Sequence, residues 1–312
     1  MNVLYKSMKK SIEQNYSCLV SYKLDNLKDE YLGQEAKPRR CRFCGKSEKE
    51  TSFNKVAHAI PHFLGNKSLK SLYECDSCNE KVFGPKENHF AHYMGLFHVL
   101  SHVSKGGKVP IYKINSKDNS KIVVDKDWTN IYCNEDDSLS VEINEEKKDI
   151  LIKSKRSYIP QEVYKILVKM ALSIMPEEEM GHFGQTLQWL MSEKNTLPNL
   201  YMIVRLYESL LPFHGRCMVY KRNNEHTENV PCYLFGLAYY NIFIQIYLPL
   251  CNDDKNLYGK VTMPFIPCKS DIDGYKYLCF DRDMSSTEKV FGEDISLPLT
   301  YHHIDMKTDS NR

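Results

Sequence analysis

Two Cys-x-x-Cys pairs enclose one histidine in the first third of this 312-residue chain. Cys41 and Cys44 form the first pair, Cys75 and Cys78 form the second, and His58 lies between them. Four thiolates in two such pairs typically hold one tetrahedral Zn²⁺ ion. A zinc ion of this kind stabilises small domains that cannot bury enough apolar surface alone. The spacing therefore predicts one structural zinc on these four cysteines.

The residues around His58 indicate a second chemistry beside the zinc. Five short motifs carry it: Ala57-His58-Ala59-Ile60-Pro61, Leu64-Gly65-Asn66, Glu74-Cys-Asp-Ser-Cys-Asn79, Phe83-Gly84 and Glu87-Asn88. An imidazole with a pKa near neutrality suits a general base. Carboxylate and amide oxygens suit a hard cation such as Mg²⁺, whereas sulfur selects zinc.

In combination these motifs resemble an HNH endonuclease domain over the stretch from Cys41 to about Ala91. The resemblance is to the subgroup with C-x-x-C, A-H-x-I-P, L-G-N, E-C-D-x-C-N and F-G-x-x-x-E-N. It implies a ββα-metal fold in which His58 is the general base. It also implies that Asn79, with Glu87 or Asn88, holds one catalytic magnesium or manganese ion. The subgroup is common in bacterial anti-phage and restriction-type nucleases, which implies a defence effector that hydrolyses DNA.

Two departures from the wider family keep an alternative open. Many HNH proteins carry Asp or Glu where this chain has Ala57, although the A-H-x-I-P subgroup shares the alanine. The central asparagine that orients the histidine falls near Lys70 or Ser71. The alternative function is therefore a zinc-stabilised nucleic-acid-binding or scaffold protein with a degenerate HNH site. The joint presence of His58, Asn79 and Glu87 favours the nuclease.

Charge is distributed unevenly along the chain. The net charge is only +2, so the whole protein is not a strongly basic nucleic-acid binder. The zinc region is nevertheless rich in cations, namely Lys37, Arg39, Arg40, Arg42, Lys46, Lys49, Lys55, Lys67, Lys70, Lys81 and Lys86. This clustering favours a polyanionic partner such as a DNA substrate, and a solvated lysine-rich surface is the alternative. Further histidines crowd the same region: His62, His89, His92, His98 and His102.

Cysteine usage and hydropathy predict the compartment. The other seven of the 11 cysteines show no paired spacing, which suits a reducing cytoplasm. The first residues are polar and mixed, without the apolar segment of a signal peptide. The longest apolar stretch, Tyr233 to Leu250, contains Gly236, Asn241 and Pro249. It predicts two buried strands and no membrane span, and hence a cytoplasmic protein.

The hydrophobic pattern predicts an α+β protein in two parts. Residues 1–108 are expected to form the HNH domain with its four-cysteine zinc site, and its helix spans Glu87 to Val103. Residues 109–312 are expected to form a mixed α+β domain with a β-meander, a helical pair and further strands. The predicted helices span 160–175 and 177–190; the predicted strands span 121–125, 129–133, 139–143, 149–153, 200–207, 216–222, 233–238, 242–248 and 260–265.

The second part shows no catalytic constellation of its own. His182 lies beside glycines and is expected to be structural or exposed. Nucleases of this subgroup often resemble effectors fused to a sensing module, such as the cyclic-nucleotide-binding SAVED module. Residues 109–312 are therefore expected to regulate the nuclease, to direct it to its target or to mediate its oligomerisation. Its expected partners are a nucleotide-type second messenger, a protein activator or a second copy of the chain. The alternative is a domain that only stabilises the nuclease or widens its DNA surface.

Overall fold

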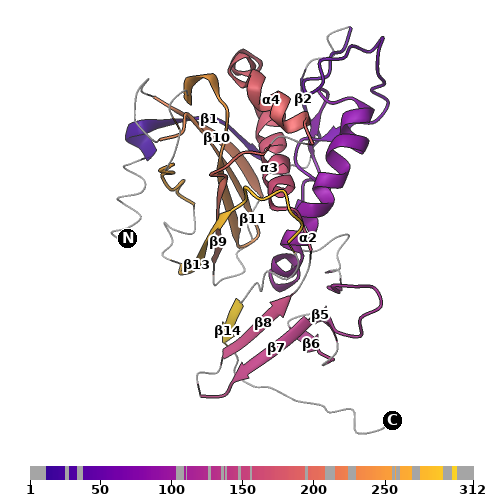
Figure 1. The fold of residues 1–312 in the computed structure, drawn as a ribbon, viewed down its shortest axis with the longest axis vertical. Helices are drawn as coiled ribbons and strands as arrows, with labels where there is room; N and C mark the ends of the chain where they lie inside the picture. Colours follow the sequence, from indigo (N-terminus) through magenta and orange to yellow (C-terminus); the bar gives the residue numbers. More distant parts are fainter. Residues whose placement is uncertain are drawn as a thin grey trace.

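The structure is a computed structural model with an α+β fold, which confirms the predicted class (Figure 1). It describes residues 12–24, 28–33, 38–102, 109, 111–125, 128–134, 137, 139–146, 149–154, 157–193, 196–207, 215–223, 230–254, 257, 261–268, 275–290 and 297–300. A large sheet lies beside three helices, and smaller strands lie at one end of the molecule (Figure 1).

The large sheet contains six antiparallel strands in the order β1-β10-β11-β12-β9-β13. Their bounds are β1 Tyr16–Lys23, β9 Tyr201–Tyr207, β10 Arg216–Arg222, β11 Tyr233–Tyr239, β12 Ile242–Tyr247 and β13 Tyr277–Asp283. The central strands β11 and β12 are buried at every residue, as their near-continuous apolar sequences require. The predicted strands at 200–207, 216–222, 233–238 and 242–248 are thereby confirmed within a residue or so.

Helix α3 covers one face of this sheet and contacts β10, β11 and β12 (Figure 1). The helix spans Pro160–Ile174 and begins with its proline in the first turn, where the missing N–H costs nothing. It ends just before Met175-Pro176, because a residue that precedes proline disfavours helical backbone. The predicted helix at 160–175 is confirmed. The second predicted helix instead divides into a 3₁₀ segment, η3 (Glu177–Phe183), and α4 (Gly184–Met191).

The predicted strand at 260–265 is wrong. Residues 261–268 are described as irregular chain, and Lys260 lies outside the described residues. Two side chains of the sheet bind this segment instead of a strand ladder. Gln245 binds the Pro264 carbonyl at 2.6 Å and the Ile266 N–H at 2.8 Å, and Arg205 donates to the Ile266 carbonyl at 2.5 Å. Proline cannot donate to a ladder, so Pro264 disfavours a paired strand here.

The region between the cysteines forms the expected ββα arrangement. Its first strand is β3 (Ala57–His58), which pairs antiparallel with β4 (Leu69–Ser71). The strand β2 (Glu30–Leu32) pairs parallel with β4 on its other edge. A π-helical segment, η2 (Cys78–Phe83), then runs directly into helix α2 (Gly84–Leu100). The predicted helix at 87–103 therefore begins earlier and, within the described residues, ends at Leu100.

The predicted meander strands form but do not make one sheet. Their bounds are β5 Lys121–Asp125, β6 Trp128–Tyr132, β7 Leu139–Asn144 and β8 Asp149–Ser154. Strands β5 and β6 make a separate hairpin, whereas β7 and β8 pair with each other and β8 also pairs with β14 (Leu297–Thr300). No helix among the described residues is long and apolar enough to cross a membrane.

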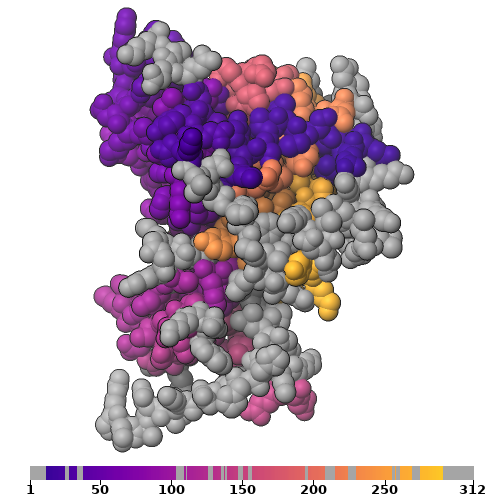
Figure 2. All heavy atoms as spheres, turned by 180° about the vertical axis from the view of Figure 1, so that it is seen from behind, coloured from indigo at the N-terminus to yellow at the C-terminus, as the bar shows by residue number. Residues whose placement is uncertain are grey.

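The two predicted parts share one core. Strand β1 from the N-terminal region is an edge strand of the six-stranded sheet, where Tyr16 pairs with Arg222 and Lys23 with Arg216. Figure 2 shows the indigo N-terminal residues crossing from the orange strands to the violet zinc region. Helix α2 also packs along α3. A functional boundary at residue 108 remains a prediction, but the chain packs across it.

Arg42, between the first two cysteines, ties the zinc region to α3. Its guanidinium donates to the carbonyls of Leu172 at 2.7 Å and Met175 at 2.8 Å, at the end of α3. It also pairs with Glu177 at 2.6 Å and stacks 3.6 Å from the ring centroid of Tyr73. Carbonyls at a helix C-terminus lack intrahelical donors, and a cation there also complements the helix dipole. The side chain is only 3% exposed.

We predict that Arg42→Ala lowers the free energy of unfolding by about 2–4 kcal/mol, because buried carbonyls lose a charged donor. Urea denaturation of the intact chain measures the change. The matched control is Arg40→Ala, since Arg40 is exposed and its guanidinium donates to the Gly45 carbonyl five residues away. An Arg42 variant as stable as the Arg40 variant would show that this contact does not hold the two regions together.

Candidate metal centre and active site

The four predicted cysteines converge on one point. The Sγ atoms of Cys41 and Cys78 are 3.8 Å apart, and those of Cys44 and Cys75 are also 3.8 Å apart. All four sulfurs lie within 4.8 Å of one another. Zn–S bonds of about 2.3 Å in a tetrahedron place sulfurs about 3.8 Å apart. The cluster is therefore compatible with a structural zinc.

Backbone contacts preform both cysteine loops. In the first loop, the Cys41 N–H donates to the Lys46 carbonyl at 2.8 Å, and the Gly45 N–H donates to the Cys41 carbonyl at 2.9 Å. Gly45 has a φ of 71°, which glycine adopts without a steric penalty. The Asp76 carboxylate accepts the N–H groups of Asn54 at 3.0 Å and Lys55 at 2.9 Å. The segment before β3 is thereby anchored to the second cysteine loop.

His58 lies at the end of strand β3, as the ββα fold predicts. It pairs across the sheet with Lys70, and its ring centroid is 5.6 Å from that of the exposed His62. Half-burial lowers the pKa of His58 below its ordinary value, and the charges of His62, Lys70 and Lys169 lower it further. A base with a lowered pKa is neutral, and able to accept a proton, at neutral pH.

Asn66 holds the connection between β3 and β4. Its amide nitrogen donates to the carbonyls of Ile60 at 2.6 Å and Leu69 at 2.8 Å, and its carbonyl accepts the Leu69 N–H at 2.9 Å. The side chain is fully buried. The asparagine that shapes this hairpin is therefore Asn66 of the Leu-Gly-Asn motif. It is not at the Lys70 or Ser71 position, where the motif pattern had placed the central asparagine.

Lys169, from helix α3, reaches the back of the site. Its ammonium is 2.8 Å from the Glu74 carboxylate, and both side chains are fully buried. The same ammonium donates to the His58 carbonyl at 3.3 Å. Burial raises the pKa of Glu87, and the positive charge of Lys169 opposes that rise. Lys169 therefore binds the backbone of His58 and also acts electrostatically on Glu87.

The π-helical segment sets the relative orientation of the predicted metal ligands. In a regular α-helix, Glu87 would lie about 80° around the axis from Asn79, eight residues earlier. The Gly84 N–H bonds to the Asn79 carbonyl in an i→i+5 pattern. Such a wider turn rotates less per residue about the axis, so we expect it to bring Asn79 and Glu87 closer to one face of the helix. Asn88 is exposed and lies about 100° around the helix from Glu87.

The other histidines of this region bind neighbouring elements. His92 donates to the Ser157 carbonyl at 3.1 Å, and His89 accepts the Ile159 N–H at 3.3 Å. His98 bonds the Tyr239 hydroxyl at 3.0 Å, and deep burial lowers its pKa to about 3. His102 bonds Thr129 at 3.2 Å. These contacts dock α2 and the turn after it onto the rest of the fold.

Several cations expected to face a polyanion are instead paired with groups of the protein itself, two of them in buried positions. Arg42 is buried against α3, and Lys86 is buried against Glu162 at 2.5 Å. Lys55 and Lys70 form ion pairs with Glu80 and Asp29. The basic surface near the site is therefore smaller than the sequence indicates. Lys37 lies outside the described residues.

Sequence patterns missed Lys169 and Glu74. Lys169 occupies an apolar helix and is separated from His58 by 111 residues, so no local spacing connects them. The sequence hints at a buried role for Lys169 only through its apolar neighbours Val168 and Met170 in α3. Glu74 precedes Cys75 and is buried. A carboxylate is rarely fully buried unless it is paired, and its partner here is Lys169.

We predict one tightly bound zinc on Cys41, Cys44, Cys75 and Cys78. Cys75→Ser should unfold the N-terminal region, because the zinc–thiolate bonds supply folding free energy there. Elemental analysis of the intact protein and its thermal melt measure the two effects. Cys18→Ser is the control, since Cys18 is exposed and outside the cluster. A Cys75 variant that melts like the parent would contradict the assignment.

Comparison with known proteins identifies the region around this site. Residues 41–90 match the model of a family described as HNH endonuclease. Searches of curated proteins and of solved structures gave no match. The matched residues include all four cysteines, His58, Asn79, Glu87 and Asn88. Residues 41–90 therefore form an HNH endonuclease domain of the type that carries a four-cysteine zinc-binding cluster.

Proposed function

We propose that this chain is a metal-dependent endonuclease that hydrolyses DNA phosphodiester bonds with His58 as the general base. The observation that carries the proposal is the position of His58. It lies at the end of the first strand of a ββα unit and has a lowered pKa, and Lys169, which binds its carbonyl, also acts electrostatically on Glu87. The family match supports nuclease activity in general. The choice of DNA as the substrate goes beyond what the family match supports.

His58 would take a proton from the attacking water on an imidazole nitrogen. The backbone carbonyl of His58 is held by Lys169 and its strand is paired with β4, so the ring is presented from a rigid element. Rigid presentation matters because a base works only within hydrogen-bonding distance of the water. His62 and Lys70 lie beside the ring and would face a bound phosphate.

Asn79 and Glu87 would hold the divalent cation, with Asn88 as the more exposed alternative ligand. The donors fit Mg²⁺ or Mn²⁺, because both are oxygen ligands and Mg²⁺ commonly keeps several waters and few protein ligands. Glu87 is partly buried, and a bound cation would offset the cost of its charge there. Such a cation would stabilise negative charge on the scissile phosphate and on the leaving oxygen.

We further propose a cytoplasmic defence role in which the C-terminal region restrains or targets the nuclease. An unrestrained DNA nuclease would damage the cell that makes it. Helix α3 belongs to that region and supplies Lys169 to the active site, so a ligand or partner that shifts α3 would also shift His58 and Glu87. A nucleotide-type second messenger, a protein activator or a second copy of the chain could act in this way. A fragment ending at residue 108 cannot test this, because β1 and α2 pack against later elements.

We predict that His58→Ala lowers the rate of plasmid nicking by at least about 100-fold, the usual contribution of a general base. DNA affinity and thermal stability should change little, because the base acts on water. Nicking by the parent should require Mg²⁺ or Mn²⁺ and stop with EDTA. His92→Ala is the control, since its ring is exposed and bonds the Ser157 carbonyl, away from the β3–β4 hairpin. Equal rates for the His58 variant and the parent would exclude His58 as the base. A parent that binds DNA but never cuts it would favour the scaffold alternative.

The pH dependence of cleavage should reflect the lowered pKa of His58. A general base acts when deprotonated, so the acid limb of kcat/KM should have its midpoint below the ordinary histidine pKa of 6.5. Lys70→Ala should move the midpoint to higher pH, because it removes a positive charge and leaves Asp29 unpaired near the ring. The exposed Lys67→Ala serves as the control. An acid limb that stays in place in the Lys70 variant would contradict this assignment.

A further inference from the structure

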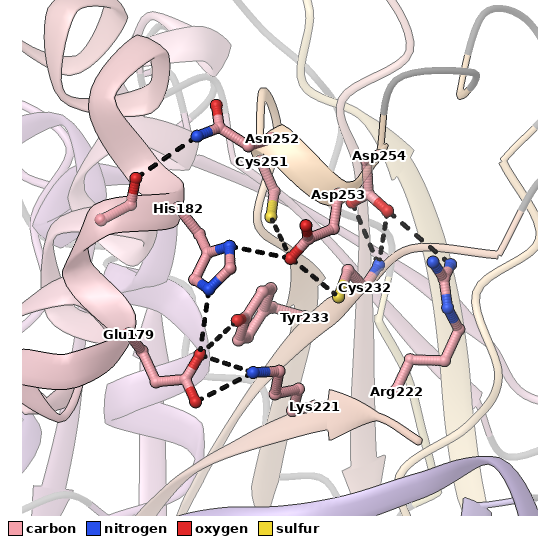
Figure 3. Close-up of polar contacts among 11 residues, drawn as sticks. Glu179, His182, Lys221, Arg222, Cys232, Tyr233, Cys251, Asn252, Asp253 and Asp254 are labelled. Atoms are coloured by element: carbon pink, nitrogen blue, oxygen red, sulfur yellow. Dashed lines mark hydrogen bonds and ion pairs between the residues drawn. The ribbon is translucent and has the colours of Figure 1, made fainter. Parts of the chain in front are cut away.

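Two cysteines without paired spacing meet at one end of the six-stranded sheet. Cys232 directly precedes β11 and Cys251 follows β12, so the β11–β12 hairpin brings together residues 19 positions apart. Both side chains are buried. The Asp253 carboxylate lies 4.0 Å from each sulfur (Figure 3). The three ligand atoms lie within 4.8 Å of one another.

His182, from η3, adjoins the group but does not lie within 4.8 Å of all three ligand atoms, so its ring would have to move closer to the sulfurs to bind the same ion. Its Nδ1 atom is 2.9 Å from the same Asp253 oxygen that faces the two sulfurs (Figure 3). A carboxylate oxygen and an imidazole lone pair are both acceptors, so this contact requires a proton or a cation. His182 was expected to be merely structural or exposed, and its side chain is 36% exposed. The structure shows that it faces a sulfur- and carboxylate-bearing cluster.

We propose that Cys232, Cys251, Asp253 and His182 form a second zinc site. Two thiolates, one imidazole and one carboxylate are ligand types that zinc takes in proteins. Sulfur disfavours magnesium and calcium at this position. A tetrahedral zinc would place each sulfur about 3.5 Å from the carboxylate oxygen, given bonds of about 2.3 Å to sulfur and 2.0 Å to oxygen. The observed 4.0 Å distances therefore need only a small contraction.

Neighbouring residues hold the ligands in place. The N–H of Cys232 donates to both oxygens of the Asp254 carboxylate, at 2.8 and 3.0 Å. The Asn252 amide donates to the Gly181 carbonyl at 3.3 Å and thereby joins the Asp253 segment to η3. These contacts orient Cys232 and Asp253, as hydrogen bonds to ligand residues do in known metal sites.

The remaining nitrogen of His182 faces a second carboxylate. Its Nε2 atom is 3.9 Å from Glu179, which is itself bound by Lys221 at 2.8 Å and by the Tyr233 hydroxyl (Figure 3). This distance is too long for a hydrogen bond; if the two groups approached each other on metal binding, the carboxylate would fix the ring tautomer and make the other nitrogen a better ligand. Two thiolates and one carboxylate carry three negative charges against two on zinc. Lys221 and Arg222 are paired with Glu179 and Asp254, so the group keeps one net negative charge when zinc is bound.

Such a zinc would fasten η3 to the end of the β11–β12 hairpin. Segment η3 also carries Glu177, the partner of Arg42 in the first cysteine loop. The two zinc sites would therefore flank one short segment between α3 and α4. Half-exposed Asp253 and His182 leave the second site open on one side. It should lose its ion to a chelator at least about tenfold faster than the four-cysteine cluster, which is closed by four sulfurs.

The test is the zinc content of the full-length chain, purified with a reductant and dialysed against micromolar zinc. We expect two zinc ions per chain in the parent and one in Cys232→Ser/Cys251→Ser. The control is Cys217→Ser, a buried cysteine outside the cluster, which should retain two. His182→Ala and Asp253→Asn should weaken the second ion at least about tenfold. Cobalt substitution supplies an independent readout, because each thiolate ligand adds to an intense charge-transfer band; the double variant removes two of the six thiolates in the two clusters and should lower the band by about one third.

One zinc per chain in the parent would overturn the proposal, and this result does not depend on how any variant folds. A Cys232–Cys251 disulfide in the reduced parent, seen as a mass lower by two hydrogens, would overturn it as well. Two zinc ions that remain in a folded double variant would place the second ion elsewhere. The count is independent of DNA cleavage, so loss of nuclease activity leaves this inference standing, and failure here leaves the HNH proposal standing.

Discussion

The buried ammonium of Lys169 is the interaction on which the nuclease site depends. It is fully buried, pairs with Glu74 beside a cysteine of the four-cysteine cluster, and binds the carbonyl of His58, the proposed general base. A buried charge without a partner costs several kcal/mol, so each group in this cluster constrains the others. The zinc loop, the first ββα strand and α2 are therefore positioned by a residue of α3, which lies far along the chain.

This dependence changes how the two halves of the protein relate. An HNH unit that folded alone would need only its zinc and its own hairpin. Here Arg42 binds the end of α3, α2 packs along α3, and β1 supplies an edge strand to the large sheet. Removal of any of these contacts exposes apolar surface or leaves carbonyls without donors. A control signal that reaches α3 has a direct physical route to the catalytic residues, with no linker to cross.

Local patterns predicted most of what is local. The Cys-x-x-Cys spacing predicted the four-cysteine cluster, and Pro160 followed by an apolar stripe predicted α3. Long apolar strands such as Ile242–Tyr247 were evident because they are buried on both faces. The 260–265 strand failed because its proline prevents pairing and side-chain bonds replace the ladder. The partner of β1 lies about 200 residues later, a distance at which periodicity carries no information.

The candidate site shows the same division between local and long-range information. The motifs predict His58, Asn79 and Glu87 as site residues, but neither the π turn after Asn79 nor the lysine that binds the His58 carbonyl has a sequence signature. The Cys232–Cys251 pair escaped notice because a whole hairpin separates the two residues. Adjacent antiparallel strands return the chain to its starting point, so their two ends meet whatever the length of the hairpin. Ligand pairs should therefore be sought across the open ends of hairpins as well as at short spacings, and in this chain both kinds of pair border the segment η3.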